Sequence, residues 1–506
     1  MTAAPTAPTS SNKSTAILLV ASTGCAMTVL DTNVVGVVLP TIARDLQASF
    51  AEIEWVISTY VLCFAALLLP AGSIADRFGR RRVFLFGITL FALASLACGL
   101  APSAPGLYLA RAAQGVGAAF LLAPALAIIG HTFHEEHARG RAWAVWGGIM
   151  GLTMVVSPLI GGAINSALGW RWAFHINVPI CAALAIAVLR LVKESRDSTP
   201  RSLDFLGILL FALAMFSVTW ALILGPGHGW TSRPVIIGAV AGVSLFAVFA
   251  RVERRREHPM LDLELFTAWP FVGAVLAMFA YASSAQVMAS LLPQFLQNGR
   301  GESALAAGVG MLPFAIAMLI FPQVGRRLSH YLDSSRILTL GLSIVALGNV
   351  IMMYAARQHG EPLLVTGMAI LGTGGGLLNG ETQKAIMGTV PHQRAGMASG
   401  ISTTARFSGI LLGFAGLGAV LASSTRAALE HAMQTAQLPI EAGVIDNIVA
   451  GDIERAVTAY SPTLADRVVS IARDGYSMGF SHAFFAAGIL ALASAIFVFI
   501  SMRRKK

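Results

Sequence analysis

The sequence has 506 residues, of which 56% are hydrophobic and only 12% are charged. Soluble globular proteins carry about 25% charged residues, so this composition excludes an ordinary soluble domain and predicts a polytopic membrane protein. The formal net charge is +10, but the basic residues lie in short loops between apolar runs. Because this placement forms no basic surface with aromatic residues between the charges, we predict no nucleic-acid partner.

Apolar runs long enough to span a bilayer, roughly 17–25 residues each, recur along the chain. They predict an all-α integral membrane protein with 14 transmembrane helices, at residues 15–40, 52–75, 83–102, 105–130, 139–166, 172–191, 205–225, 234–252, 269–297, 304–328, 336–356, 361–388, 395–422 and 480–502. Residues 1–14 are rich in Ala, Pro, Ser and Thr, and we predict that they form a disordered tail.

The basic residues gather on one side of these predicted helices. Loops after even-numbered spans, such as 77–82 and 251–256, are strongly basic, and so is the C-terminal tail. Loops after odd-numbered spans carry mostly one basic residue each. The positive-inside rule therefore predicts a multi-pass protein of the cell inner membrane with both termini in the cytoplasm. The one long external loop, 423–479, has the apolar spacing of short amphipathic helices.

The loop at residues 72–82 reads Gly-Ser-Ile-Ala-Asp-Arg-Phe-Gly-Arg-Arg-Arg. The two apolar runs that it joins must form a helical hairpin, because lipid offers no partner for an unpaired backbone. Arginines lie within reach of the single aspartate. An ordinary positive-inside loop is the alternative, but the spacing is more specific and closely resembles the loop signature of the major facilitator superfamily of transporters. This resemblance implies a charge-paired latch on the inner face, so we expect a conformational switch that involves Gly72, Asp76, Arg77, Gly79, Arg80 and Arg81.

Two opposite charges lie inside apolar spans, Asp31 in the first and Arg111 in the fourth, at similar depth. A carboxylate at this depth is costly unless it is protonated, paired or functional. We expect the two side chains to face a shared polar cavity and Asp31 to carry the coupling proton; a static ion pair is the alternative. Other polar side chains expected at the substrate cavity are Asn33, Tyr60, Gln114, Gln286 and Asn379.

Two further spans contain residues that suggest function. The fifth holds Pro158, Gly161 and Gly162, which would bend the helix and thin one of its faces, so we expect it to take part in conformational switching. The twelfth holds Glu381, with Lys384 three residues later. This is the spacing of a helical ion pair. A local salt bridge is the favoured interpretation of Glu381, and proton coupling is the alternative.

No feature predicts a cofactor or a metal. The four cysteines lie inside apolar runs without metal-ligand spacing. His131, His134 and His137 cluster after the fourth span and would suit a membrane-embedded enzyme, but they match no known motif. There is no nucleotide-binding signature either. We therefore predict a protein that is neither an enzyme nor driven by ATP.

Taken together, these stretches resemble the fourteen-helix drug:proton antiporter branch of the major facilitator superfamily. The resemblance is carried by residues 30–40, Glu54-Trp55-Val56 with Tyr60, the 72–82 loop, the Arg111 motif, residues 157–162, Trp170-Arg171-Trp172 with Asn177-Val178-Pro179, Val390-Pro391 with residues 394–400, and Thr404-Ala405-Arg406. It implies two six-helix bundles about a central cavity, here 15–191 and 269–502, with two linking helices at 205–252. It also implies proton-driven efflux of small lipophilic compounds by alternating access.

The sequence departs from that branch in several places. Ser157 and Gly36 stand where glycine and asparagine are usual, and the second copy of the basic loop, 325–333, lacks an Asp-Arg pair. The ninth and tenth spans contain no acid, which weakens any expectation of a strongly cationic substrate. A dedicated metabolite exporter and a proton-coupled importer are the alternative functions. The expected partners are a small-molecule substrate, protons, the lipid bilayer and periplasmic or outer-membrane efflux components, and the expected state is a monomer.

Overall fold

The computed structural model describes residues 11–133, 135–196, 204–256, 263–358, 360–390, 395–439, 441, 443–458 and 460–503. Within these ranges the chain is built of helices and contains no strand. Fourteen segments of the described chain are long and apolar enough to cross a bilayer. The predicted all-α class and the predicted number of spans are therefore confirmed.

The first part of the chain forms α1 (Ser11–Asp45), α2 (Phe50–Phe78), α3 (Arg80–Gly99), α4 (Ala104–Thr132), α5 (Glu136–Leu168), α6 (Trp172–His175), α7 (Asn177–Leu191), α8 (Phe205–His228) and α9 (Arg233–Glu253). Because α1 begins at Ser11, residues 11–14 of the predicted disordered tail are helical. Residues 1–10 lie outside the described ranges.

The second part forms the 3-10 turn η1 (Leu263–Thr267), α10 (Trp269–Tyr281), the π-helical turn η2 (Ala282–Gln286), α11 (Val287–Gln294), the π-helical turn η3 (Phe295–Gly299), α12 (Ala304–Gly310), α13 (Leu312–Leu328), α14 (Ser334–Gln358), α15 (Glu361–Leu378), α16 (Glu381–Gly388), α17 (Ala395–Thr435), α18 (Val444–Ala450), α19 (Ile453–Val457) and α20 (Pro462–Arg503). The predicted ninth and twelfth spans are thus each made of several pieces. In the twelfth, Gly380 has a φ of 90°, which side-chain-bearing residues rarely adopt, and the helix stops there and restarts at Glu381.

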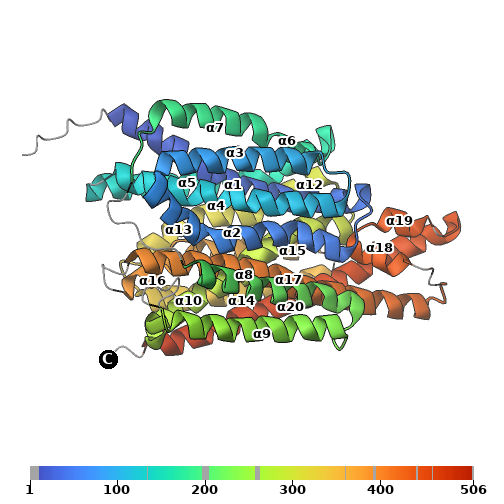
Figure 1. Cartoon of the computed structure of the whole chain (residues 1–506). Helices are drawn as coiled ribbons and strands as arrows, with labels where there is room; N and C mark the ends of the chain where they lie inside the picture. Colours follow the sequence, from blue (N-terminus) through green and yellow to red (C-terminus); the bar gives the residue numbers. More distant parts are fainter. Residues whose placement is uncertain are drawn as a thin grey trace, which may run out of the picture.

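The helices run side by side along one axis, as Figure 1 shows. The beginning of α1 and the end of α20 lie at one end of the molecule, which we call the terminal end (Figure 1). The short helices α18 and α19 project from the opposite end, which we call the cap end (Figure 1). Every spanning helix therefore has one end in each of these two regions, and the direction of the chain alternates from one span to the next.

Helix contacts fall into two groups. In the first, α2 and α3 both pack on α4, and α1 packs on α4 and α5. In the second, α14 packs on α15 and α20, and α17 packs on α10 and α20. We call α1–α7 the first helix group and α10–α17 with α20 the second. The pair α8 and α9 stands beside them, and α8 contacts both α2 and α17. The exact domain boundaries given by the sequence stay a prediction.

Two seams join the helix groups, one between α2 and α17 and the other between α5 and α12. In the first seam, the rings of Phe64 and Phe407 lie 4.3 Å apart between centroids. In the second, a Cβ added to Gly162 would lie 2.6 Å from the carbonyl oxygen of Ala304. The backbones approach so closely there that only glycine fits, which is typical of small residues at membrane helix contacts.

Two helices extend beyond the spans predicted for them, 395–422 and 480–502. Helix α17 continues to Thr435 and α20 begins at Pro462, so both run into the predicted external loop 423–479, whose bounds outside the membrane stay a prediction. Between them, α18 and α19 are the short helices that the apolar spacing predicted. The loss of apolar character near residue 422 reflects a change of surroundings, since a helix that leaves the apolar layer can continue with polar residues on its exposed face.

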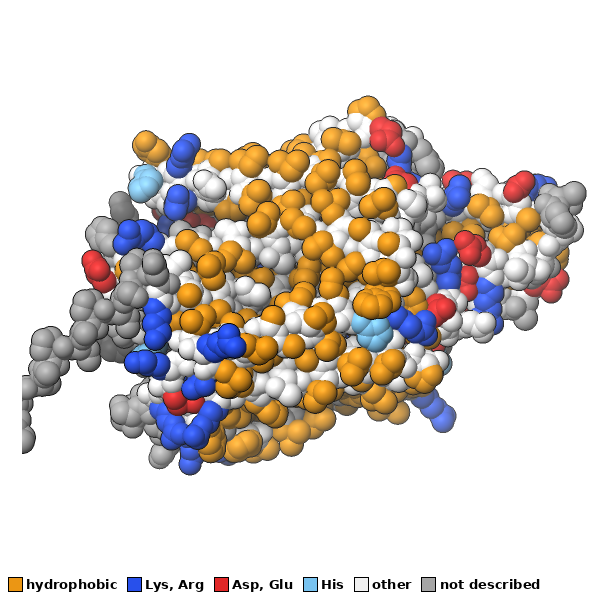
Figure 2. Space-filling model, turned by 90° about the horizontal axis from the view of Figure 1, so that it is seen from above, with side chains coloured by type: hydrophobic (Ala, Val, Ile, Leu, Met, Phe, Trp, Pro, Cys, Tyr) orange, Lys and Arg blue, Asp and Glu red, His pale blue; other side chains and the backbone are white. Residues whose placement is uncertain are grey.

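The surface is divided as a membrane protein requires. Figure 2 shows one face with a broad band of hydrophobic side chains across the middle, lysines and arginines at the terminal end, and mixed charges around the cap. Large apolar side chains are exposed along the band, among them Leu93, Leu109, Val243 and Ile496. Such a continuous apolar surface is stable only against lipid.

Candidate functional site

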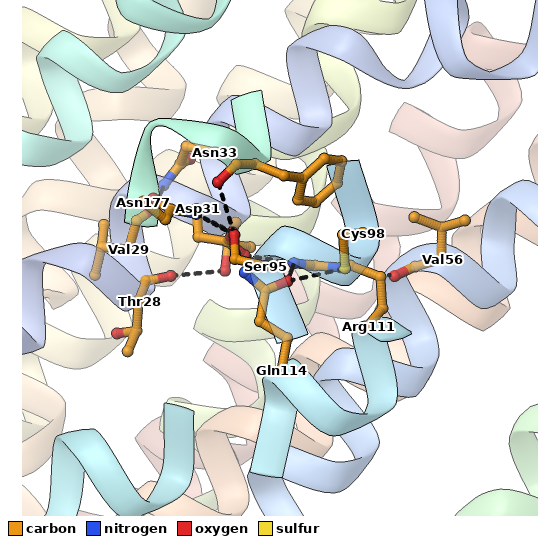
Figure 3. A network of polar contacts seen from close by, with 12 residues as sticks. Thr28, Val29, Asp31, Asn33, Val56, Ser95, Cys98, Arg111, Gln114 and Asn177 are labelled. Atoms are coloured by element: carbon orange, nitrogen blue, oxygen red, sulfur yellow. Dashed lines mark hydrogen bonds and ion pairs between the residues drawn. The ribbon is translucent and has the colours of Figure 1, made fainter. Parts of the chain in front are cut away.

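Asp31 on α1 and Arg111 on α4 form an ion pair inside the first helix group (Figure 3). Arg111 Nη1 lies 2.5 Å from Asp31 Oδ2, and the two side chains are 1% and 0% exposed. Gln114 Nε2 and Asn177 Nδ2 donate to the other carboxylate oxygen, at 2.8 Å and 3.1 Å. An ionised carboxylate can only accept hydrogen bonds, so three donors match its charged form.

The guanidinium of Arg111 is also compensated on its other sides. Its Nε donates to the carbonyl oxygen of Val56 on α2 at 3.2 Å, and its Nη1 donates to Gln114 Oε1 at 2.7 Å. The ring of Tyr60 lies 4.1 Å from its Cζ, in a cation–π contact. A buried cation needs such partners, because its loss of hydration otherwise exceeds the attraction of a single carboxylate.

Two residues of this network were not recognised as site residues from the sequence. Asn177, at the start of α7, was noted only as part of the family resemblance, and Ser95 on α3 was not noted. Asn177 Nδ2 donates to Ser95 Oγ at 3.0 Å, and that hydroxyl donates to the carbonyl oxygen of Phe174 at 2.8 Å (Figure 3). An asparagine in an apolar span was an available signal, whereas serine is too common in such helices to be one.

A narrow pocket lies between the two helix groups. It is lined on the first-group side by Asn33, Met154 and Pro158, and on the other by Ala289, Ser290, Pro293, Met311, Phe314, Ala315 and Met318. Asn33 was expected at the substrate cavity and lines this pocket. Tyr60 and Gln114, also expected there, instead pack in the Asp31 network, which is sealed from solvent in this conformation. The charge pair and the pocket are therefore separate sites in this state.

The remaining predicted cavity residues lie in the second helix group. Gln286, in the π-helical turn η2, accepts a hydrogen bond from Arg406 Nε on α17 at 3.1 Å. Arg406 is a cation within an apolar span. Its charge could have indicated a site residue, but it was noted only as part of the family resemblance. Asn379 lies half-buried at the break between α15 and α16. These two positions are not brought together with the Asp31 network.

Glu381 makes the local contacts that its sequence spacing predicted. Lys384 Nζ lies 3.3 Å from its Oε1, and the hydroxyl of Ser334 donates to the same oxygen at 2.7 Å. The carboxyl is buried while the lysine is half exposed. This arrangement favours the salt-bridge interpretation. Proton coupling by Glu381 stays a prediction.

The 72–82 loop is held within the first helix group. Arg80 Nη2 lies 2.8 Å from Asp76 Oδ1. Glu194, just after α7, accepts hydrogen bonds from the backbone amides of Arg81 and Arg82, at 3.1 and 3.3 Å. Gly79 has a φ of 114°, and a Cβ there would lie 2.6 Å from the Glu194 carboxyl. Glu194 was not predicted, because 113 residues separate it from Arg81.

Other residues of the predicted switch have simpler surroundings. Gly72 faces Ala123 on α4 at an ordinary contact distance, 3.9 Å from a Cβ placed on the glycine, and Arg77 is exposed. In α5, a Cβ at Gly161 would lie 3.2 Å from Val34 Cα on α1, so this glycine allows close packing there. The helix α5 runs on through Pro158. The switch role of all these residues stays a prediction.

The described residues contain no group of three or more His, Cys, Asp or Glu side chains that could hold a metal. The four cysteines are free thiols. His134, one of the three clustered histidines, lies outside the described ranges. The arrangement that the structure does show is a buried charge pair next to a pocket between two helix groups.

Comparisons with solved structures agree with this fold. A bacterial homologue of the human lysosomal transporter Spinster, in an inward-facing and occupied conformation, superposes with a TM-score of 0.69 over 98% of each chain, at 17% sequence identity. A POT family transporter in complex with 5-aminolevulinic acid gives a TM-score of 0.64, with 98% of this chain and 97% of the other covered, at 13% identity. At such low identity the likeness supports the fold alone.

Comparisons of sequence are more specific. The chain is 35% identical to multidrug resistance protein Stp of Mycobacterium tuberculosis, over 85% of this chain and 80% of Stp. It is 30% identical to multidrug efflux pump LfrA of Mycolicibacterium smegmatis, over 94% of both chains. It is also 30% identical to the tetracenomycin C resistance and export protein of Streptomyces glaucescens, over 94% of this chain and 90% of the other. The sequence profile described as Major Facilitator Superfamily matches residues 21–414, and the chain therefore belongs to this superfamily of transporters.

Proposed function

We propose that this protein is a drug:proton antiporter that exports small lipophilic compounds across the inner membrane by alternating access. Its relatives named above are a multidrug resistance protein, a multidrug efflux pump and an antibiotic export protein. The observation that carries the proposal is the Asp31 network, since a buried carboxylate with three donors, one of them a cation, is the expected form of an intramembrane proton site.

The network can exchange a proton only if its donors change. In the present state Asp31 accepts from Arg111, Gln114 and Asn177, and all these side chains are buried. These donors come from α4 and α7, so a shift of α1 against those helices would leave the carboxylate with fewer hydrogen-bond donors and without its cation. A proton would then replace the lost donors. The substrate would bind next to this network, in the pocket that Asn33 lines.

The orientation follows from the charge distribution. The terminal end holds the 72–82 loop and Arg503 at the end of α20, so we infer that it faces the cytoplasm. The cap end, with α18 and α19, then faces outward. The monomer and a coupling to periplasmic or outer-membrane components remain part of the proposal, and size measurement and copurification would test them.

The decisive experiment measures proton release when a drug is added to purified protein in weak buffer. The unaltered protein should release protons on binding drug, and Asp31→Asn should not. Asp45→Asn is the matched control, because it makes the same change near the end of the same helix, where the carboxylate is half exposed and pairs with Arg171. If Asp31→Asn still released protons and still pumped against a gradient, Asp31 would not be the coupling acid.

The breadth of the substrate range needs a separate measurement. Some relatives are named for many drugs and one for a single antibiotic, tetracenomycin C. Growth inhibition by a panel of unrelated drugs, in cells with and without the gene, distinguishes a multidrug pump from a dedicated exporter. Inverted vesicles distinguish export from import by the direction of substrate movement.

A further inference from the structure

A second acid, Glu54, lies in the seam between the helix groups. It is one turn inside the cap end of α2, after the N-cap Ser49, and only 3% of its surface is exposed. Its Oε2 is buried without a hydrogen-bond partner in the described part of the chain. A buried carboxylate oxygen without a partner makes the ionised form costly, so these surroundings favour the neutral, protonated form of Glu54.

The opposite wall of the seam is backbone. A Cβ added to Gly418 on α17 would lie 2.7 Å from Glu54 Oε1 and 3.2 Å from Oε2. The glycine therefore lets α17 cover the carboxyl directly. On α2, the neighbouring Trp55 packs against Phe216 and Trp220 of α8, with centroids 5.6 Å and 5.9 Å away. Trp55 thus packs this turn of α2 against α8, and α17 of the second group covers the carboxyl of Glu54.

The charged groups on the helices around α2 are engaged elsewhere. The titratable group near enough to Glu54 for an electrostatic interaction is the phenol of Tyr476 on α20, which donates to the carbonyl oxygen of Val449 at 2.9 Å. The nearby cations and their partners are Arg111 with Asp31, Arg406 with Gln286, Arg426 with Asp446 and Arg44 with Glu454. His228 of α8 is exposed.

We propose that Glu54 is a second proton-binding site, which takes up a proton when the cap end closes and releases it when the seam between α2 and α17 opens. The inference rests on the alternating access of the proposed function, but not on the role of Asp31. Opening would bring water to the carboxyl and remove the cost of its charge. Because Glu54 lies about one turn inside the cap end of α2, opening of the seam there would return its proton to the same side, and closure would depend on the pH on that side.

The sign of the effect follows from proton linkage. Opening releases a proton from Glu54, so a rise in pH favours the open state. While one proton is exchanged, the ratio of open to closed molecules should rise about tenfold per pH unit. At low pH the carboxyl stays neutral and the seam stays closed. The effect is one of conformation and is expected in the absence of drug.

The test measures the distance between spin labels at Ala167→Cys on α5 and Gln434→Cys on α17, both exposed near the cap end. The purified full chain, with its native cysteines replaced, is placed in nanodiscs over a range of pH. Asp31→Asn is present throughout, so that any remaining pH dependence cannot come from Asp31. We expect the open fraction to rise with pH in this background, and to become independent of pH when Glu54→Gln is added.

Two controls keep the result specific. Glu52→Gln removes a neighbouring carboxylate but preserves the capping box with Ser49, which glutamine can also form, so it should leave the pH dependence unchanged. Glu54→Asp restores an acid and should restore the dependence. Equal pH dependence with and without Glu54→Gln, or none in the Asp31→Asn background, would overturn the proposal. The proposal would also be overturned if a cationic drug, added at constant pH, opened the protein with Glu54 but not the Glu54→Gln variant. In that case Glu54 would bind the drug rather than a proton.

These outcomes are separate from those of the proposed function. If Asp31→Asn abolishes drug-driven proton release while Glu54→Gln leaves the pH dependence of opening unchanged, Asp31 couples transport and Glu54 is only structural. If Glu54 governs opening but Asp31→Asn still couples drug to protons, the proposed function fails at Asp31 and the seam proposal stands.

Discussion

The two buried acids of this protein, Asp31 and Glu54, differ in what surrounds them. Asp31 lies within one helix group, where three donors reach its carboxylate. Glu54 lies between the two groups, against the backbone of Gly418, and its Oε2 has no partner in the described chain. Burial is nearly equal, at 1% and 3% exposed. Because the two acids are almost equally buried, we expect their hydrogen-bond partners to decide which protonation state each one favours.

The contacts within a helix group differ in a similar way from the contacts between the two groups. Inside the first helix group, polar side chains form one connected hydrogen-bond network across α1, α3, α4 and α7. Across the seams, contacts are mainly apolar or involve glycine and backbone, as at Gly162 and Gly418. Matched polar networks resist separation, whereas a seam without such matching can part and close again. This difference suits two rigid bodies that move against each other.

Arg111→Ala should have the largest effect, because it leaves the Asp31 carboxylate buried without its cation. We expect a loss of about 3–5 kcal/mol in the free energy of unfolding. Glu54→Gln replaces a neutral carboxyl by a neutral amide and should change the free energy of unfolding by less than about 1 kcal/mol. Thermal unfolding of purified variants in detergent measures both. Equal losses would break the proposed distinction between the two acids.

The double variant Arg111→Ala with Asp31→Asn sharpens this prediction. Removing both charges avoids an uncompensated ion, so the double variant should lose less stability than the two single variants added together. Where Arg111→Ala still transports, its optimum should move to higher pH, because Asp31 would hold its proton more strongly without the cation. A transport optimum at lower pH would contradict the pairing as the control of Asp31.

Gly162→Val tests the glycine seam. The added side chain would meet the backbone of Ala304, which cannot move aside as a side chain can. Overpacking of this kind costs about 1–3 kcal/mol, here in the state with the cap end closed. We expect normal insertion but poor transport or a proton leak. Gly147→Val is the control, because nothing lies within 4 Å of a Cβ at that glycine. Normal coupled transport by Gly162→Val would show that close packing there is dispensable.

How much of this was predictable from sequence depends on the range of each interaction. Asp31 and Arg111 were predictable, because a charge in an apolar span is rare and two such charges at similar depth attract each other. Lys384 was found as the partner of Glu381 through its spacing of three. Glu194 was not, since its contact with the 72–82 loop joins distant parts of the chain. Hydropathy reveals spans, but not which side chains of two helices meet.

Glu54 shows a second limit. An acid in the first turns of a helix is ordinary, because it complements the helix dipole and is usually exposed to water. Only the position of α17, whose Gly418 covers the carboxyl, distinguishes it from its neighbour Glu52. The breaks in α15–α16 and the π-helical turns were likewise hidden, since the apolar pattern runs through them. The length of α17 was hidden because an apolar run marks the membrane and not the helix end.

Asp76→Asn should have a moderate effect. It removes the 2.8 Å contact with Arg80, but both side chains are partly exposed, and such a pair is worth at most about 1 kcal/mol. We therefore expect turnover to fall by no more than about fivefold, with the KM for drug unchanged, because the loop lies far from the pocket that Asn33 lines. Glu194→Gln should slow turnover similarly. A proportional loss of drug binding would show that the loop does not act only on switching.

Glu454→Gln should have the smallest effect, although it removes an ion pair that joins α1 of the first helix group to α19 at the cap end. Arg44 Nη1 lies 3.1 Å from Glu454 Oε1, longer than the 2.5 Å of the Asp31 pair, and the side chains are 38% and 82% exposed. Water and salt screen such a pair, so its contribution to the closed state is a few tenths of a kcal/mol and should disappear at high ionic strength. The spin-label distance between α5 and α17, measured at low and high salt, should show a slight opening in Glu454→Gln at low salt only. A large opening at any salt concentration would mean that the cap, rather than the buried seam at Glu54, holds this end closed.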